Sequence, residues 1–121
     1  MKEKLVIDTN YLIYLAKQKK FFVLEELFKR FSCFIVKKTF DEIDKLERGK
    51  YKFRISLLKK ILEKAIKEKK VKVIEGKNVD KKIIELAKEN FNVASFDKEL
   101  EKKIKKINKK IKIIKKFDFD F

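Results

Sequence analysis

Four acidic residues, Asp8, Glu42, Asp80 and Asp97, occupy positions in this sequence that favour chemistry. Asp8 directly follows the apolar run 5–7, where burying a carboxylate is costly unless a cation or a hydrogen-bond donor receives it. The chain has no His and a single Cys, which excludes Ser-His-Asp catalysis, Cys-His catalysis and the usual transition-metal ligand sets. Carboxylates, amides and hydroxyls remain, and these groups suit hard cations such as Mg²⁺ and Mn²⁺.

Short apolar strands alternate with amphipathic helices along the chain, without a linker or an internal repeat. We predict helices around residues 11–15, 21–28, 40–46, 52–69, 83–90 and 100–107, and strands over residues 4–8, 33–36, 71–74, 92–94 and 111–114. Parallel strands need crossover connections, so this alternation predicts an α/β fold. The expected architecture is a three-layer α/β/α sandwich around a central parallel sheet of four or five strands, formed by residues 1–121 as one domain.

The segment 52–69 has the clearest helical periodicity. Its apolar positions Phe53, Leu57, Ile61 and Ala65 recur every four residues, and further apolar residues flank them. The opposite side of this helix is almost wholly charged. We therefore expect the stripe that begins at Phe53 to face the core.

The four acids follow successive strands of the predicted sheet. Asp8 ends the first strand, Glu42 lies early in the helix after the second, Asp80 opens the helix after the third, and Asp97 lies just past the fourth. Ligands of open α/β sheets bind beyond the carboxyl ends of the strands, so all four side chains can face one site. Clustered carboxylates raise one another's pKa values and need cations or shared protons. Asp80 and Asp97 also fit as helix N-caps, and Glu42 as a helix-surface charge.

Basic residues outnumber acidic ones, 35 to 19, which gives a formal net charge of +16. Such a charge favours a polyanionic partner, RNA or DNA, because bound phosphates release counterions. A composition shaped by genome bias or thermal adaptation explains the charge equally well. Lys37, Lys38, Arg48 and Lys98 flank the acidic motifs and are candidates for phosphate contact, with a solvated surface as the alternative.

Cys33 lies in an apolar run and is expected in the core, where it is no nucleophile. No N-terminal apolar stretch indicates a signal peptide or a membrane span, so a reducing cytoplasm is the expected location. A membrane-surface role lacks the basic amphipathic helix with a bulky aromatic face that it needs.

Four segments of the chain, residues 5–10, 40–46, 80–87 and 93–100, resemble the conserved motifs of the PIN-domain (PilT N-terminus) nucleases in order and spacing. The likeness is to small PIN proteins of the archaeal ribosomal-RNA-processing type and of the VapC-like toxin type. It implies an Mg²⁺- or Mn²⁺-dependent endoribonuclease whose products carry 5′-phosphate and 3′-hydroxyl ends.

The resemblance also assigns roles to individual residues. Asp8 would be the central metal ligand, Glu42, Asp80 and Asp97 would complete the acidic cluster, and Asn10 and Ser95 would support it. Asp41 and Asp44 are alternatives to Glu42, because consecutive helical positions point about 100° apart and cannot all face one site; the family pattern favours Glu42. The chain departs from many members in having Val79 in place of a further acid and no Pro before the second motif.

Three biological roles follow from the resemblance. The first is ribosomal-RNA maturation in a pre-ribosomal particle, and the second is the toxin half of a toxin–antitoxin pair. The third is a catalytically silent module that binds RNA or protein. The alternating Phe and Asp residues at 117–121 predict a segment that either covers an apolar surface or joins a homodimer interface.

Overall fold

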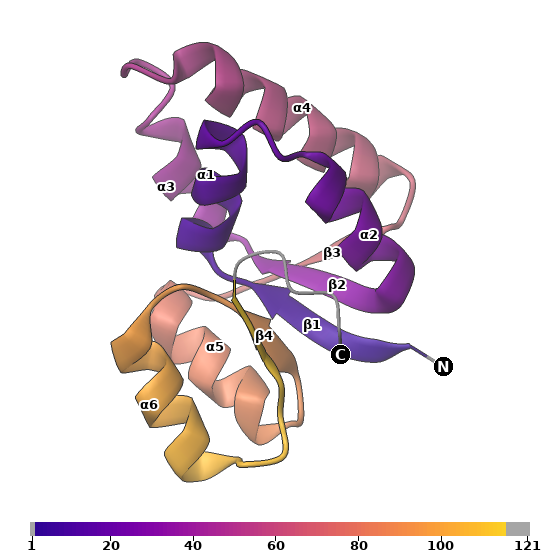
Figure 1. Ribbon diagram of the computed structural model, residues 1–121, viewed down its shortest axis with the longest axis vertical. Helices are drawn as coiled ribbons and strands as arrows, with labels where there is room; N and C mark the ends of the chain where they lie inside the picture. The colour runs from indigo at the N-terminus through magenta and orange to yellow at the C-terminus, as the bar shows by residue number, and fades with distance from the viewer. Residues whose placement is uncertain (1, 116–121) are drawn as a thin grey trace.

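A parallel five-stranded sheet forms the centre of the computed structural model, which describes residues 2–115 (Figure 1). All neighbouring strands pair in parallel, in the order β3-β2-β1-β4-β5. The strands are β1 (Glu3–Ile7), β2 (Phe31–Val36), β3 (Val71–Ile74), β4 (Asn92–Ala94) and β5 (Ile113–Ile114). The five predicted strands are thus confirmed, and β1 lies in the middle of the sheet.

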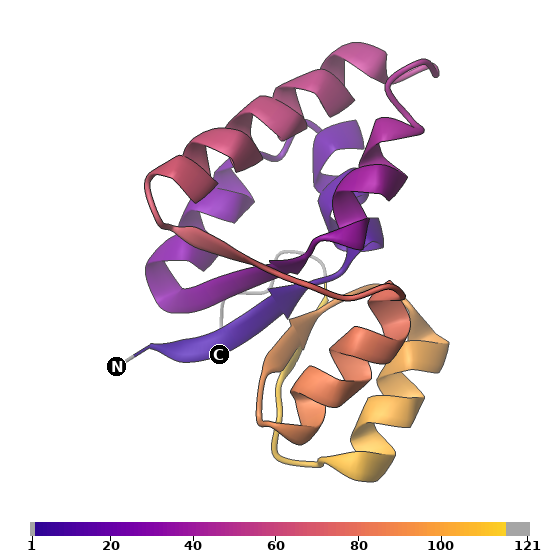
Figure 2. The same ribbon diagram turned by 180° about the vertical axis from the view of Figure 1, so that it is seen from behind.

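Helices cover both faces of this sheet. Figures 1 and 2 show one side covered by α1 (Thr9–Lys17), α2 (Phe22–Arg30), α3 (Lys38–Asp44) and α4 (Lys52–Lys67). The other side carries α5 (Val79–Lys88) and α6 (Lys98–Ile107). The predicted three-layer α/β/α sandwich is therefore the observed architecture.

The pleat of the central strand explains why both faces are covered. Leu5 and Ile7 belong to the larger core cluster, under α1 to α4, whereas Val6 belongs to the second cluster, under α5 and α6. All three side chains are completely buried. A strand with buried residues on both faces has a continuous apolar sequence, which is the pattern that ends at Asp8.

The long helix α4 differs from the sequence prediction in its rotation about its axis. Ile55, Leu58 and Leu62 are completely buried, whereas Phe53 is 80% exposed and Leu57 is 46% exposed. The buried stripe therefore lies to one side of the predicted one. The helix carries more apolar residues than one face can bury, so periodicity alone does not decide which of them face the core.

None of the helices within residues 2–115 has the length and apolar character needed to cross a membrane. The predicted association segment at 117–121 lies outside the described residues.

Candidate functional site

The carboxyl ends of β1 and β4 lie side by side and bring Asp8 next to Ser95. Ile7 pairs with Ala94 in the sheet, and the Asp8 amide donates a hydrogen bond of 2.9 Å to the Ala94 carbonyl. The Ser95 amide in turn donates to the Ile114 carbonyl at 3.1 Å. The sheet hydrogen bonds thus continue one residue past each strand and fix the backbone of both residues.

The Asp8 carboxylate is buried, with only 5% of the residue exposed. Its Oδ1 accepts a 2.8 Å hydrogen bond from the Thr9 amide, and its Oδ2 accepts a 2.7 Å bond from Ser95 Oγ. Burial raises the pKa of Asp8 from 3.8 to about 6, and the nearby charges of Asp80 and Asp97 add to the rise. The hydrogen bonds from Ser95 and Thr9 offset part of it. Asp8 is therefore an acid that a nearby cation would stabilise in its charged form.

Polar contacts hold the segment after β4 against the start of α1. Ser95 Oγ accepts a 3.1 Å hydrogen bond from the Asp97 amide in addition to its bond to Asp8. Asn10 Oδ1 accepts a 3.2 Å bond from the Phe96 amide. Asn10 and Ser95, both expected beside the acids, thus fix the segment that carries Asp97.

Asp97 caps α6, as one reading of the sequence expected. Its Oδ1 accepts hydrogen bonds from the amides of Glu99 and Leu100, at 3.0 and 3.1 Å. Within residues 2–115, Asp97 Oδ2 accepts no hydrogen bond. The capping role and a role at the site are thus compatible, because they use different oxygens.

Glu42 contacts the start of α1, whereas Asp41 and Asp44 form ion pairs elsewhere. Thr9 Oγ1 donates a 2.5 Å hydrogen bond to Glu42 Oε1, directly beside Asp8. Asp41 instead pairs with Lys38 at 3.4 Å, and Asp44 pairs with Lys59 at 2.8 Å. Among these three acids, Glu42 is the one that contacts a neighbour of Asp8.

The hydroxyl of Thr9 connects Glu42 to the core. Thr9 Oγ1 lies 3.0 Å from Thr39 Oγ1, and Thr39 is completely buried in α3. Sequence reasoning did not single out either threonine. The position of Thr9 directly after Asp8 was the available signal, but its contact with α3 depends on how two helices pack.

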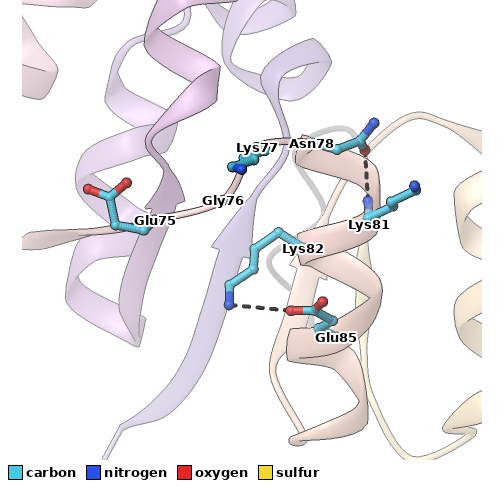
Figure 3. Close-up of a pocket in the computed structure, with 7 residues that line it drawn as sticks. All are labelled: Glu75, Gly76, Lys77, Asn78, Lys81, Lys82 and Glu85. Carbon is cyan, nitrogen blue, oxygen red and sulfur yellow. Dashed lines mark hydrogen bonds and ion pairs between the residues drawn. The ribbon is translucent and has the colours of Figure 1, made fainter.

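Asp80 lies in the first turn of α5 without capping it. Asn78 is the N-cap, and its side chain accepts a 3.0 Å hydrogen bond from the Lys81 amide (Figure 3). Within the described part of the chain, Asp80 accepts no hydrogen bond and makes no ion pair. The capping alternative for Asp80 is therefore wrong, and its carboxylate is available to a ligand.

The electrostatic surroundings of Asp80 tie it to the other acids. Partial burial raises its pKa, and the charges of Asp97 and then Glu42 raise it further. Lys103 on α6 opposes this rise and is the cation that acts on Asp80. Lys103 has no motif signal in the sequence, because its nearness to Asp80 arises only from the packing of α6 beside α5.

The short connection between β3 and α5 fixes where Asp80 lies. It runs through Gly76, close to α5 and to the end of β2, and borders a cavity of about 510 Å³ (Figure 3). A Cβ at Gly76 would lie 3.0 Å from Lys82 Cγ and 3.1 Å from Val36 Cγ1. A larger residue would push against both side chains, so this glycine permits the close approach.

The charges of Asp80 and Asp97 act on Asp8, and those of Asp97 and Glu42 act on Asp80, with Asp8 buried and Asp80 exposed to solvent. Within residues 2–115, no three of these side chains already form a ready-made ligand set for one ion. The chemistry of the donors nevertheless fits a hard divalent cation: the groups are carboxylates, a hydroxyl and an amide, and Asp8 is a buried acid among like charges. Asp80 lies in the first turn of α5 and Glu42 in the second turn of α3, and a change of side-chain rotamer at either residue would move its carboxylate oxygens.

The four basic residues expected to contact phosphate have different surroundings. Lys37 forms an ion pair with Glu75 at 3.4 Å, and Lys38 forms its pair with Asp41. Arg48 is exposed in the turn between α3 and α4, and Lys98 is exposed at the first position of α6, next to Asp97. The four residues do not form one patch, because Lys37, Lys38 and Arg48 lie near the two ends of α3 and Lys98 lies on α6, on the other side of the sheet.

No protein-family model matches this chain, and no curated protein is significantly similar to it. The function is therefore inferred from the site itself.

Proposed function

We propose that this chain is a metal-dependent endoribonuclease of the PIN type, in which Asp8, Glu42, Asp80 and Asp97 hold Mg²⁺ or Mn²⁺. One observation carries the proposal: at the carboxyl end of a parallel sheet, the charges of Asp80 and Asp97 act on the buried Asp8, and Glu42 accepts a hydrogen bond from Thr9, the next residue after Asp8. A buried acid whose pKa is raised by burial and by neighbouring carboxylates is typical of a functional site.

The reaction would be hydrolysis of an RNA phosphodiester bond. A divalent ion bound to these acids would lower the pKa of a water molecule and stabilise charge on the leaving oxygen. The water would lose a proton to solvent as its oxygen bonds to phosphorus, the bond from phosphorus to the 3′-oxygen would break, and that oxygen would take up a proton, leaving 5′-phosphate and 3′-hydroxyl ends. Within the chain, Ser95 and the Thr9 amide hold the Asp8 carboxylate, and the Thr9 hydroxyl holds Glu42.

The net charge of +16 supports RNA as the substrate, because a polyanion must approach a site that is itself acidic. Ribosomal-RNA processing in the cytoplasm, with a pre-ribosomal particle as partner, is the role we favour. The toxin of a toxin–antitoxin pair uses the same chemistry. Crosslinking of an Asp8→Asn chain to RNA in its native cell, followed by sequencing, would distinguish the two roles through the RNA that is trapped.

The direct test is cleavage of single-stranded and structured RNAs by the purified chain. We expect cleavage with Mn²⁺ or Mg²⁺, none with EDTA, and loss of at least a hundredfold in rate for Asp8→Asn and Glu42→Gln. Asp41→Asn and Asp44→Asn are matched controls that should keep activity, because these acids pair with lysines. Cleavage that persists in Asp8→Asn would overturn the proposal; RNA binding without cleavage would favour a silent RNA-binding module.

A further inference from the structure

A second cavity, of about 590 Å³, lies beside the acidic site along α6. Phe96, which stands between the site residues Ser95 and Asp97, forms part of its wall. The rest of the wall comes from α6 and from Lys115, which follows β5. The cavity is therefore lined by the same short segment that contacts Asp8 through Ser95.

The Phe96 ring packs against two tyrosine rings and also lines this cavity. It stacks on the buried Tyr11 ring with centroids 5.0 Å apart and an interplanar angle of 18°, and it meets the edge of Tyr14 at 4.8 Å. Its backbone is fixed by the hydrogen bond from its amide to Asn10. A flat apolar group in the cavity could extend this stack without any rearrangement of the ring.

The rim of the cavity is strongly basic. It comprises one acid, Glu101, and the lysines Lys98, Lys102, Lys105, Lys106 and Lys115. Three of these lysines have partners: Lys115 pairs with Glu101 at 2.8 Å, Lys105 donates to the Ile111 carbonyl, and Lys102 lies 3.9 Å from Glu99. Within residues 2–115, Lys98 and Lys106 make no ion pair and no side-chain hydrogen bond. Both are exposed and suited to bind an anion.

We infer that this cavity binds one unpaired nucleobase of a single-stranded RNA, stacked on Phe96, while the flanking phosphates bind Lys98 and Lys106. An aromatic surface surrounded by lysines matches the two halves of a nucleotide, a flat base and a negative phosphate. A base in a duplex is already stacked and paired and would not enter. The inference rests on the proposed function, because a base held on Phe96 brings the neighbouring phosphodiester toward Asp8 and Asp97.

The chain contains no Trp, so Phe96→Trp introduces a single fluorescent reporter into the cavity. We expect its emission to be quenched when oligouridylate is added in EDTA, which keeps the RNA intact. An oligonucleotide of the same length without bases should leave the emission unchanged. The matched control is Phe53→Trp, on α4 at the opposite face of the sheet, where the native ring is 80% exposed. Equal quenching at both positions, or none at position 96, would overturn the inference.

Affinity gives a second measurement that does not depend on the tryptophan variant. Phe96→Leu should weaken binding of labelled oligouridylate about tenfold, because stacking of a base contributes an effect of that size. Lys98→Ala/Lys106→Ala should weaken binding and lower its dependence on salt, whereas Lys60→Ala/Lys67→Ala, which removes the same charge from α4, should do so far less. An equal loss in both double variants would show that net charge, and not this cavity, binds RNA.

Two further outcomes keep this inference separate from the proposed function. Quenching at position 96 without cleavage in Mn²⁺ would support the base-binding cavity and contradict the nuclease. Cleavage without quenching would support the nuclease and contradict the cavity. A chain truncated after Lys116 tests whether residues 117–121, rather than RNA, occupy the cavity. If truncation alone changes the emission at position 96 and RNA does not, the inference is wrong.

Discussion

Ser95 Oγ donates a 2.7 Å hydrogen bond to Asp8 Oδ2 across 87 positions of the sequence. The contact exists because β1 and β4 are neighbours in the sheet, with Ile7 opposite Ala94. The same oxygen accepts a hydrogen bond from the Asp97 amide. Ser95 thus connects the buried acid with the segment that carries the acid capping α6.

Ser95→Ala should therefore weaken metal binding without removing a ligand. The variant loses a donor that lowers the pKa of Asp8, so the carboxylate holds its proton more tightly. We expect Mn²⁺ affinity at neutral pH to fall about tenfold to a hundredfold, as is typical when a partner of a ligand is removed. Isothermal titration with Mn²⁺ measures this effect, and Ser32→Ala, in β2, is the control; unchanged affinity in Ser95→Ala would contradict the role of Ser95.

Asp8→Asn should make the metal-free chain more stable at neutral pH. Burial raises the pKa of Asp8 above its unfolded value of 3.8, to about 6, so the folded state binds the proton more tightly than the unfolded state. Stability from this group is therefore complete below the unfolded pKa and is lost as pH rises from 3.8 through about 6. That rise in pKa corresponds to roughly 3 kcal/mol at neutral pH.

Urea unfolding in EDTA, at about pH 7.5 and about pH 3.5, measures this difference. The asparagine variant should gain stability relative to the native chain at the higher pH and lose that advantage at the lower one. An advantage of the same size at both pH values would show that the charge of Asp8 is not its cause.

Divalent ions should raise the melting temperature of the native chain. An ion that binds only the folded state, at a hundredfold excess over its Kd, adds about 2.7 kcal/mol, which is roughly 10 °C for a domain of this size. The increase should shrink at low pH, because Asp8 must lose its proton before it can bind an ion. Glu42→Gln should reduce the increase in melting temperature, and Asp41→Asn should not. Scanning calorimetry of both variants with and without Mn²⁺ measures the increase, and an equal reduction in the two variants would contradict the role of Glu42.

The Thr9 and Thr39 hydroxyls form a buried hydrogen-bonded pair, and a double-mutant cycle measures the free energy of their interaction. Thr9→Val leaves the completely buried Thr39 hydroxyl without its partner at 3.0 Å, which should cost about 1–3 kcal/mol of unfolding free energy. Adding Thr39→Val should recover part of this loss. Because Thr9 also donates to Glu42, RNA cleavage should fall in both chains that lack the Thr9 hydroxyl. Additive losses of stability would contradict the pairing.

Much of the architecture was predictable from local sequence. Apolar runs such as 5–7 and 33–36 form strands because side chains on both faces of the sheet are covered, and this burial leaves a continuous apolar pattern. The location of Asp8 at the end of such a run also indicated a carboxylate at the edge of the sheet. These features depend on residues next to one another in the chain, so the sequence alone contains them.

Local sequence did not decide between neighbouring residues of similar chemistry that could take the same structural role. Asp80 and Asn78 both fit the start of α5, and only the backbone path after Gly76 makes Asn78 the cap. The face that α4 buries depends on the elements packed against it, which cover Ile55 and Leu58 and leave Phe53 exposed. Such choices follow from packing against segments elsewhere in the chain.

For the acidic site, the sequence by itself determined the residue types and the strand ends that they follow. Only the tertiary structure decided that Glu42 rather than Asp41 meets Thr9, that Ser95 holds Asp8, and that Lys103 acts on Asp80. The physical reason is that hydrogen bonds and charge interactions depend on distances of a few ångströms between segments that are far apart in sequence. Those distances are set by strand order and helix packing, which no local pattern encodes.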